Sequence, residues 1–197
     1  MNRFILATVF LLWSSFVVLA QDLPKLNGLP VKVTANSHAQ SDHLIFKGIP
    51  IDGDIEQFSK QLISVGYTES LRFTEKYIKW FEGMFMDEKC FIGVFHSPKG
   101  LVGRVDVLYL YPSYSEMNSA FNDAISLYRT KYGSPDLSQS DVYIWDVPHG
   151  GIAITKISND GKYKLLITYE DSKNGEIVVE ERNAAIKREK ASRINDI

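Results

Sequence analysis

The clearest hydrophobic pattern in the first half of the chain has helical spacing. Apolar residues recur every three or four positions over residues 55–65, in IEQFSKQLISV. Asp54 precedes the pattern as a candidate N-cap, with Gln57 three positions later as in a capping box, and Gly66 follows as a left-handed stop. These features predict a helix of about three turns.

Three carboxylates stand at alternate positions where this helix begins: Asp52, Asp54 and Glu56. Alternating acidic residues also occur in calcium-binding loops. A loop of the EF-hand type that began at Asp52 would need glycine at its sixth position and glutamate at its twelfth, but the chain has Gln57 and Ile63 there. We therefore interpret the carboxylates as residues of the helix N-terminus, where the helix dipole favours negative charge.

A second helical pattern lies between Ser113 and Gly133. Ser113 and Glu116 form a capping box, and Gly133 followed by Pro135 marks the end of the helix. The apolar positions form a stripe that predicts a face packed on the core: Tyr114, Met117, Phe121, Ala124, Ile125 and Tyr128.

Elsewhere apolar and polar residues alternate, and aromatic and β-branched residues are enriched, as is typical of strands. A short strand is expected to end at Ile51. Six longer strands are predicted, three after each helix: 77–85, 90–96, 101–110, 141–147, 151–158 and 163–169. The short polar turns between them are typical of antiparallel hairpins.

The order of these elements divides the folded part into two similar halves, 43–110 and 111–170. In each half a helix precedes three strands, and each first strand carries a tryptophan, Trp80 or Trp145. We therefore predict an α+β domain over residues 43–175, in which two tandem helix-plus-three-strand units form one antiparallel sheet. The helices would cover one face and leave the other partly exposed. A charged C-terminal helix is predicted for residues 176–197.

The first twenty residues, MNRFILATVFLLWSSFVVLA, have the features of a signal peptide with cleavage after Ala20. The alternative, an uncleaved anchor, is less favoured because the apolar run is short and two serines interrupt it. Residues 21–42 lack clear periodicity and predict a flexible leader. We expect a periplasmic or secreted protein with no membrane span after cleavage.

Charge and cysteine content narrow the classes of function. Without Arg3, the formal net charge of −2 becomes −3, which gives no support for nucleic-acid binding. Cys90 is the only cysteine, so the chain forms no intramolecular disulfide. Its position in an apolar run favours a small buried residue over a nucleophile.

Catalytic and metal-binding motifs are not found in the sequence. The histidines lack the spacing of a local zinc site, and there is no nucleophile elbow, P-loop or dinucleotide fingerprint. We expect no metal and no cofactor. A periplasmic enzyme of unknown type stays an alternative, and it would require Cys90, His96, His149 and an acidic residue to converge in one cleft.

Five residues are the candidates for a binding surface: Trp80, Arg104, Asp106, Trp145 and Lys164. We expect the tryptophans, Arg104 and Lys164 on the face away from the helices, where aromatic and arginine side chains favour partner binding. The alternatives are that the tryptophans belong to the core and that Arg104 and Asp106 form a surface ion pair.

These observations favour an exported, non-enzymatic protein that binds a protein partner through the exposed sheet face. Another possible function is binding of a small apolar ligand in a pocket between sheet and helices, lined by Tyr114, Phe121 and Tyr128.

The order of tandem helix-plus-hairpin units behind a signal peptide resembles the architecture of β-lactamase-inhibitor-protein-like proteins, over roughly residues 43–170. That resemblance implies an inhibitor-like interaction protein, although the inhibitor-like proteins use paired cysteines that this chain lacks. The segments FKGIPIDG (46–53) and YEDSKNG (169–175), with the central hairpins, resemble a group of small secreted proteins of Gram-negative gut bacteria. That group has no assigned activity, so the resemblance implies no catalytic residues.

Overall fold

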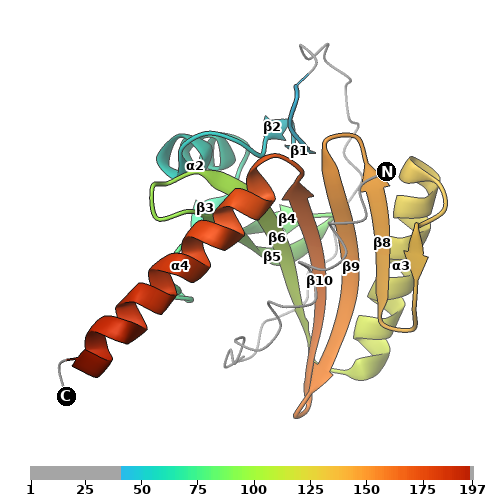
Figure 1. Cartoon of the computed structure of the whole chain (residues 1–197). Coiled ribbons are helices and arrows are strands. Elements are labelled where there is room, and N and C mark those ends of the chain that lie inside the picture. The colour runs from blue at the N-terminus through green and yellow to red at the C-terminus, as the bar shows by residue number, and fades with distance from the viewer. Residues whose placement is uncertain (1–40, 196–197) are drawn as a thin grey trace.

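The computed structural model describes residues 41–195 and shows an eight-stranded antiparallel sheet with three helices (Figure 1). The helices are α2 (Ile55–Ser64), α3 (Tyr114–Tyr132) and α4 (Asn174–Asn195). This architecture confirms the predicted α+β class, with its large antiparallel sheet and C-terminal helix. The predicted signal peptide and nearly all of the predicted leader lie outside the described residues.

The sheet has the strand order β3-β4-β5-β6-β10-β9-β8-β7. The six longer strands match the six predicted strands to within two residues: β4 (Ile78–Phe85), β5 (Glu88–His96), β6 (Val102–Tyr111), β8 (Val142–Val147), β9 (Gly150–Asn159) and β10 (Lys162–Asp171). β6 and β10 pair at the centre, which joins the two halves of the chain. The edges are the two-residue strands β3 (Thr68–Glu69) and β7 (Leu137–Ser138), which are too short to show an alternating pattern.

Local hydrogen bonds explain where the first two helices begin and end. The Asp54 carboxylate accepts a bond from the Glu56 N–H at 2.8 Å, and the Ser113 hydroxyl accepts one from the Glu116 N–H at 3.2 Å. Both residues are therefore the N-caps that the sequence predicts. Gly66 and Gly133 follow α2 and α3 with φ of 100° and 84°, in the region that favours glycine.

The strand expected to end at Ile51 is instead a small hairpin, so that prediction is wrong. β1 (Ile45–Phe46) pairs with β2 (Ile49–Pro50) in a two-stranded sheet. Lys47 and Gly48 connect the two strands with φ of 52° and 83°. Two successive positive φ angles reverse the chain as in a type I′ turn, which a Lys-Gly pair does not signal as clearly as Asn-Gly.

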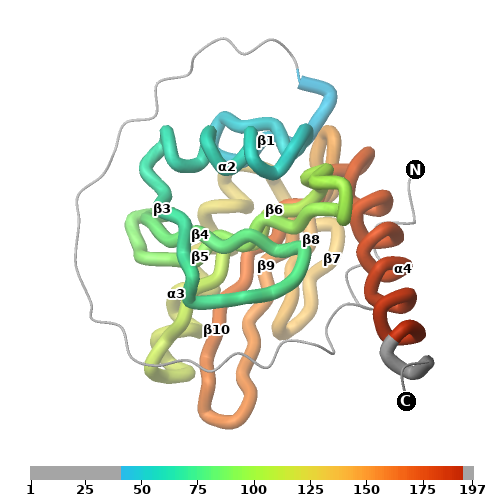
Figure 2. Tube along the Cα trace, turned by 90° about the vertical axis from the view of Figure 1, so that its left-hand side faces the viewer, coloured from blue at the N-terminus to red at the C-terminus, as the bar shows by residue number. Residues whose placement is uncertain are grey.

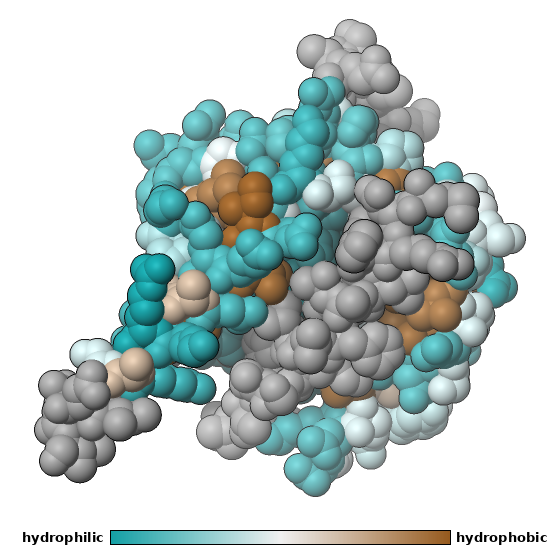
Figure 3. Space-filling model, viewed as in Figure 1, coloured by the Kyte–Doolittle hydropathy of each residue, from teal (hydrophilic) through white to brown (hydrophobic). Residues whose placement is uncertain are grey.

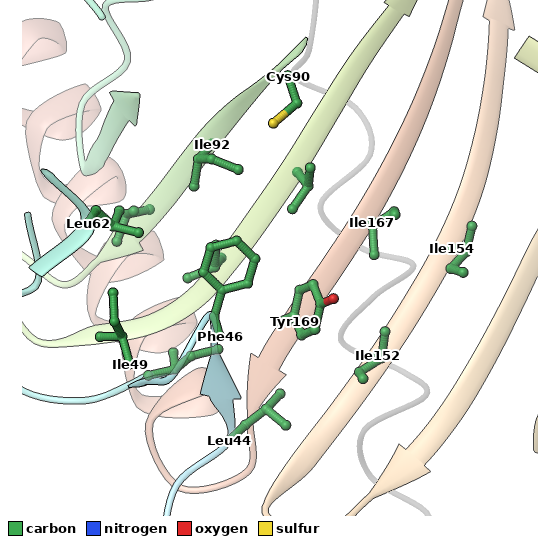
Figure 4. Close-up of a cluster of buried hydrophobic side chains, with 14 of the residues drawn as sticks. Leu44, Phe46, Ile49, Leu62, Cys90, Ile92, Ile152, Ile154, Ile167 and Tyr169 are labelled. Atoms are coloured by element: carbon green, nitrogen blue, oxygen red, sulfur yellow. The ribbon is translucent and has the colours of Figure 1, made fainter. Parts of the chain in front are cut away.

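The main core lies between the sheet and the layer formed by α2, α3 and the β1–β2 hairpin. Figure 4 shows that Leu62 of α2, Phe46 of β1 and the isoleucines of β5, β9 and β10 gather on this face of the sheet. The side chains of Phe46, Leu62, Ile92, Ile154 and Ile167 are at most 1% exposed. Burial of these apolar side chains is the main source of stability that the fold offers.

α4 lies on the other face of the sheet, which we call the second face (Figures 1 and 2). It packs closely at its first turns, because a Cβ on Gly103 of β6 would lie 2.7 Å from the Asn174 carbonyl oxygen and 2.8 Å from Val178. The Asp171 carboxylate accepts bonds from the N–H groups of Lys173 and Asn174 and so caps the helix. Among residues 41–195, no helix combines the length and the apolar character needed to cross a membrane.

Candidate functional site

Four of the five predicted binding residues lie on the second face. Residues paired across an antiparallel sheet point to the same side, and Trp80 pairs with Gly93, which pairs with Asp106. Arg104 shares the strand parity of Asp106, as does Lys164 through its pairing with Leu110. Figure 3 views the molecule from this side, where the described surface is mainly hydrophilic and a hydrophobic cluster lies beside α4.

Trp145 does not join them, and its predicted place on the face away from the helices is wrong. The side chain is 1% exposed and lies among the core residues under α3, with its ring centroid 5.8 Å from that of Tyr128. Its indole N–H donates to the Gly133 carbonyl oxygen at 3.0 Å. The end of α3 therefore holds the indole in the core, which is the alternative that the sequence left open.

Trp80 lies on the predicted face, but it is only 3% exposed. The loop between β3 and β4 covers it, with the Phe73 ring centroid 4.7 Å from the Trp80 ring. From the same loop, Glu75 accepts a hydrogen bond from the Trp80 indole at 3.3 Å. With Ile78, Phe91, Phe95 and Leu108, these aromatic residues form a second, smaller apolar cluster.

A buried ion pair lies beside this cluster. The Arg104 guanidinium donates two hydrogen bonds to the Asp106 carboxylate, at 2.8 and 2.7 Å, and stacks on the Phe95 ring at 4.5 Å. Burial opposes ionisation of Arg104, but the charge and hydrogen bonds of Asp106 outweigh it and raise the pKa of the guanidinium. The side chains are 11% and 3% exposed, so the pair is not the surface pair that the sequence suggested.

Arg182 of α4 brings a second guanidinium to Phe95, at 4.8 Å from the ring centroid. Burial, together with the positive charge of Arg104, lowers the pKa of Arg182 to about 10. Its Nε atom is buried and has no hydrogen-bond partner among the described residues. A buried donor without an acceptor is costly, and it is therefore rare in folded proteins.

Two carboxylates and a lysine complete this group. Burial raises the pKa of Glu170, which pairs with Arg104 across the sheet, and also raises the pKa of Glu75. Lys164 is 9% exposed, and burial followed by the positive charge of Lys162 lowers its pKa. The negative charge of Glu75 attracts the Lys164 ammonium and opposes part of this shift in its pKa. We call the following residues the charged cluster: Glu75, Arg104, Asp106, Lys164, Glu170 and Arg182.

The residues considered for catalysis lie apart from one another. Burial, together with the positive charge of Arg182 in the charged cluster, lowers the pKa of His96. Cys90 faces the main core, its thiol contacts the Gly83 carbonyl oxygen at 3.8 Å, and burial raises its pKa to about 12. His96 lies at the other end of β5 and donates from Nδ1 to the Ser97 carbonyl oxygen at 2.8 Å. His149 lies in the β8–β9 turn with φ of 70°. Within residues 41–195, no group of three His, Cys, Asp or Glu side chains is arranged to hold a metal ion.

The residues expected to line an apolar ligand pocket are used differently in the structure. Phe121 and Tyr128 are 2% and 6% exposed and pack directly against Tyr143 and Trp145 of β8. Tyr114 is 50% exposed at the start of α3. These three side chains therefore fill the space between helix and sheet or lie on the surface.

Sequence reasoning did not identify Arg182, Glu75 and Glu170 as members of a site. Arg182 belongs to the charged C-terminal segment, which we interpreted as a helix surrounded by solvent, and Glu75 lies in a loop. Only Glu170 carried a usable signal, because it follows the strand alternation Lys164, Leu166, Thr168. The docking of α4 on the sheet brings these residues together.

Comparisons of the chain with protein-family models, with curated proteins and with solved structures found no match.

Proposed function

We propose that this chain is an exported, non-enzymatic protein that binds a protein partner through the second face of its sheet, at the charged cluster. The observation that carries the proposal is the buried Arg182 Nε, which lacks an acceptor among the described residues. The Arg182 side chain as a whole is partly exposed, so a partner carboxylate beside the guanidinium would form a charge-assisted hydrogen bond and offset the cost of its burial.

Lys164 supports the same kind of partner. Its ammonium shares the second face with Arg182, and both groups interact with Glu75. Two partly desolvated cations favour an acidic side chain at the interface. The proposed partner is therefore a protein that presents an Asp or Glu side chain to Arg182 and Lys164 on the second face.

Export and ancestry complete the proposal. The apolar N-terminal run followed by small residues at 18 and 20 supports export through a cleavable signal. The strand order of the sheet is symmetric about β6 and β10. In each half the helix is followed by a short edge strand and three long strands, which supports an origin as two tandem units. An inhibitor-like role would agree with both features.

The test compares variants that remove one positive charge. The C-terminally tagged chain, purified after export, is crosslinked in the native envelope, and a captured protein is then produced and titrated against each variant. We expect R182Q and K164Q each to weaken binding by about tenfold or more, since each removes a charged contact. R188Q and K187Q, at exposed positions on α4, are the matched controls and should change the affinity less than twofold.

Urea unfolding of each variant separates loss of binding from loss of fold. A stable R182Q variant that binds as well as the unmodified chain would refute the role of the charged cluster. Failure to capture any saturable partner across several growth conditions would weigh against the binding function itself.

A further inference from the structure

A depression of about 500 Å³ lies between α3 and β8, away from the charged cluster. It is lined by Asn122, Ile125, Ser126, Arg129, Thr130 and Tyr143. The five helical residues repeat at intervals of four, as 122, 126 and 130 and as 125 and 129, so they form one stripe along α3 beside β8. Tyr143 lies close to the edge of the sheet, because its neighbour β7 has only two residues.

Arg129 is the one charged residue among the described residues that line the depression. The Arg129 guanidinium lies 5.5 Å from the centroid of the Tyr143 ring, and its side chain forms no ion pair or hydrogen bond with a described residue. None of the lining residues is acidic. In a chain with a formal net charge of −2, the single positive charge of Arg129 favours an anionic ligand at this position.

The remaining lining groups suit the rest of a small ligand. Asn122, Ser126 and Thr130 offer amide and hydroxyl groups, and Ile125 with the Tyr143 ring offers an apolar floor. The depression is open to solvent, since Asn122, Ser126, Arg129 and Thr130 are exposed. Arg129 can make two parallel hydrogen bonds to a carboxylate or phosphate group while its plane stays on the ring.

We propose that this depression binds a small organic anion, whose carboxylate or phosphate group pairs with Arg129 and whose flat apolar body packs on Tyr143 and Ile125. The proposal is independent of the protein partner on the second face. It assigns to α3 a ligand site along its flank beside β8, next to the packed interface between the helix and the sheet.

Amide NMR spectra of the uniformly ¹⁵N-labelled chain, purified after export, test this site. The probes are benzoate, acetate, inorganic phosphate and the uncharged benzyl alcohol. We expect benzoate to produce saturable shift changes in residues 122–130 and 143, and benzyl alcohol to produce far smaller ones. A stronger response to benzoate than to acetate would support the aromatic contact, and the phosphate titration tells whether phosphate replaces carboxylate.

R129Q should weaken benzoate binding by about tenfold or more, because it removes the charge-assisted pair. K131Q is the matched control, since Lys131 lies in the same last turn of α3, is exposed and does not line the depression. It should change the affinity less than twofold. Equal losses in R129Q and K131Q, equal responses to benzoate and benzyl alcohol, or no saturable shift up to about 10 mM benzoate would overturn the proposal.

Discussion

At the scale of single residues, Arg104 and Asp106 show how a surface-like sequence pattern can become a buried pair. Their spacing of two places both side chains on one face of β6, as expected for a strand. The Phe95 ring on the neighbouring strand and the packing of α4 on β6 then bury both side chains, of which 11% and 3% stay exposed. Two hydrogen bonds compensate the loss of hydration.

D106N should destabilise the chain by about 3 kcal/mol, because it leaves the buried Arg104 charge without its counter-ion. We expect the lower part of the range for such pairs, since Glu170 lies next to Arg104 across the sheet. Urea unfolding followed by tryptophan fluorescence measures the change.

The double variant R104M/D106L is the control for this prediction. It removes both charges and keeps apolar volume, so it should recover most of the lost stability. A double variant as unstable as D106N would mean that packing at this position matters more than the unpaired charge.

At the scale of elements, α4 is the helix whose role the sequence leaves most open. Its composition is charged, yet Val178 is 1% exposed and packs against β6 at Gly103. Farther along, the helix is tied to loops by ion pairs from Lys99 to Glu181 and from Lys76 to Glu189, both at 2.8 Å. Such exposed pairs contribute little, so the first turns dominate the docking of the helix.

G103A should therefore displace α4 and destabilise the chain by about 1–3 kcal/mol. The added methyl group would meet the Asn174 carbonyl oxygen at 2.7 Å, and backbone atoms cannot yield without movement of the helix. Hydrogen exchange read by mass spectrometry should show faster exchange in α4, with α3 unchanged as the internal reference. Unchanged protection of α4 in G103A would contradict its docking on β6.

At the scale of the whole molecule, stability should depend on pH through His96. The ring is half-buried, and burial lowers its pKa below the ordinary value. The unfolded chain therefore binds a proton at a higher pH than the folded chain. The free energy of unfolding should fall as the pH drops below about 6.5 and stop falling, for this group, below the folded pKa.

H96Q should flatten this part of the stability curve, because glutamine can still donate a hydrogen bond but does not titrate. Chemical denaturation at several pH values between about 5.5 and 7.5 measures the difference between the two chains, above the range in which carboxylates dominate. An identical slope in H96Q would assign the pH dependence to other groups.

The sequence by itself determined the two cap-bounded helices, the C-terminal helix and the six long strands. These elements depend on hydrogen bonds and side-chain contacts within a few residues, as Asp54, Ser113 and Gly66 show. Alternation along the strands also placed Trp80, Arg104, Asp106 and Lys164 on a common face. The limit of this reasoning is that alternation says which residues share a face, and not which face a helix will cover.

The tertiary structure decided everything that depends on contacts between distant segments. Trp145 became a core residue because α3 ends over it, and Arg182 joined Arg104 because α4 crosses the second face. The pairing of β6 with β10 likewise joins segments that are remote in sequence. The strands β1, β2, β3 and β7 have only two residues each, which is too short to show a period. The charged cluster therefore exists only in the folded chain, since its residues come from one loop, two strands and the last helix.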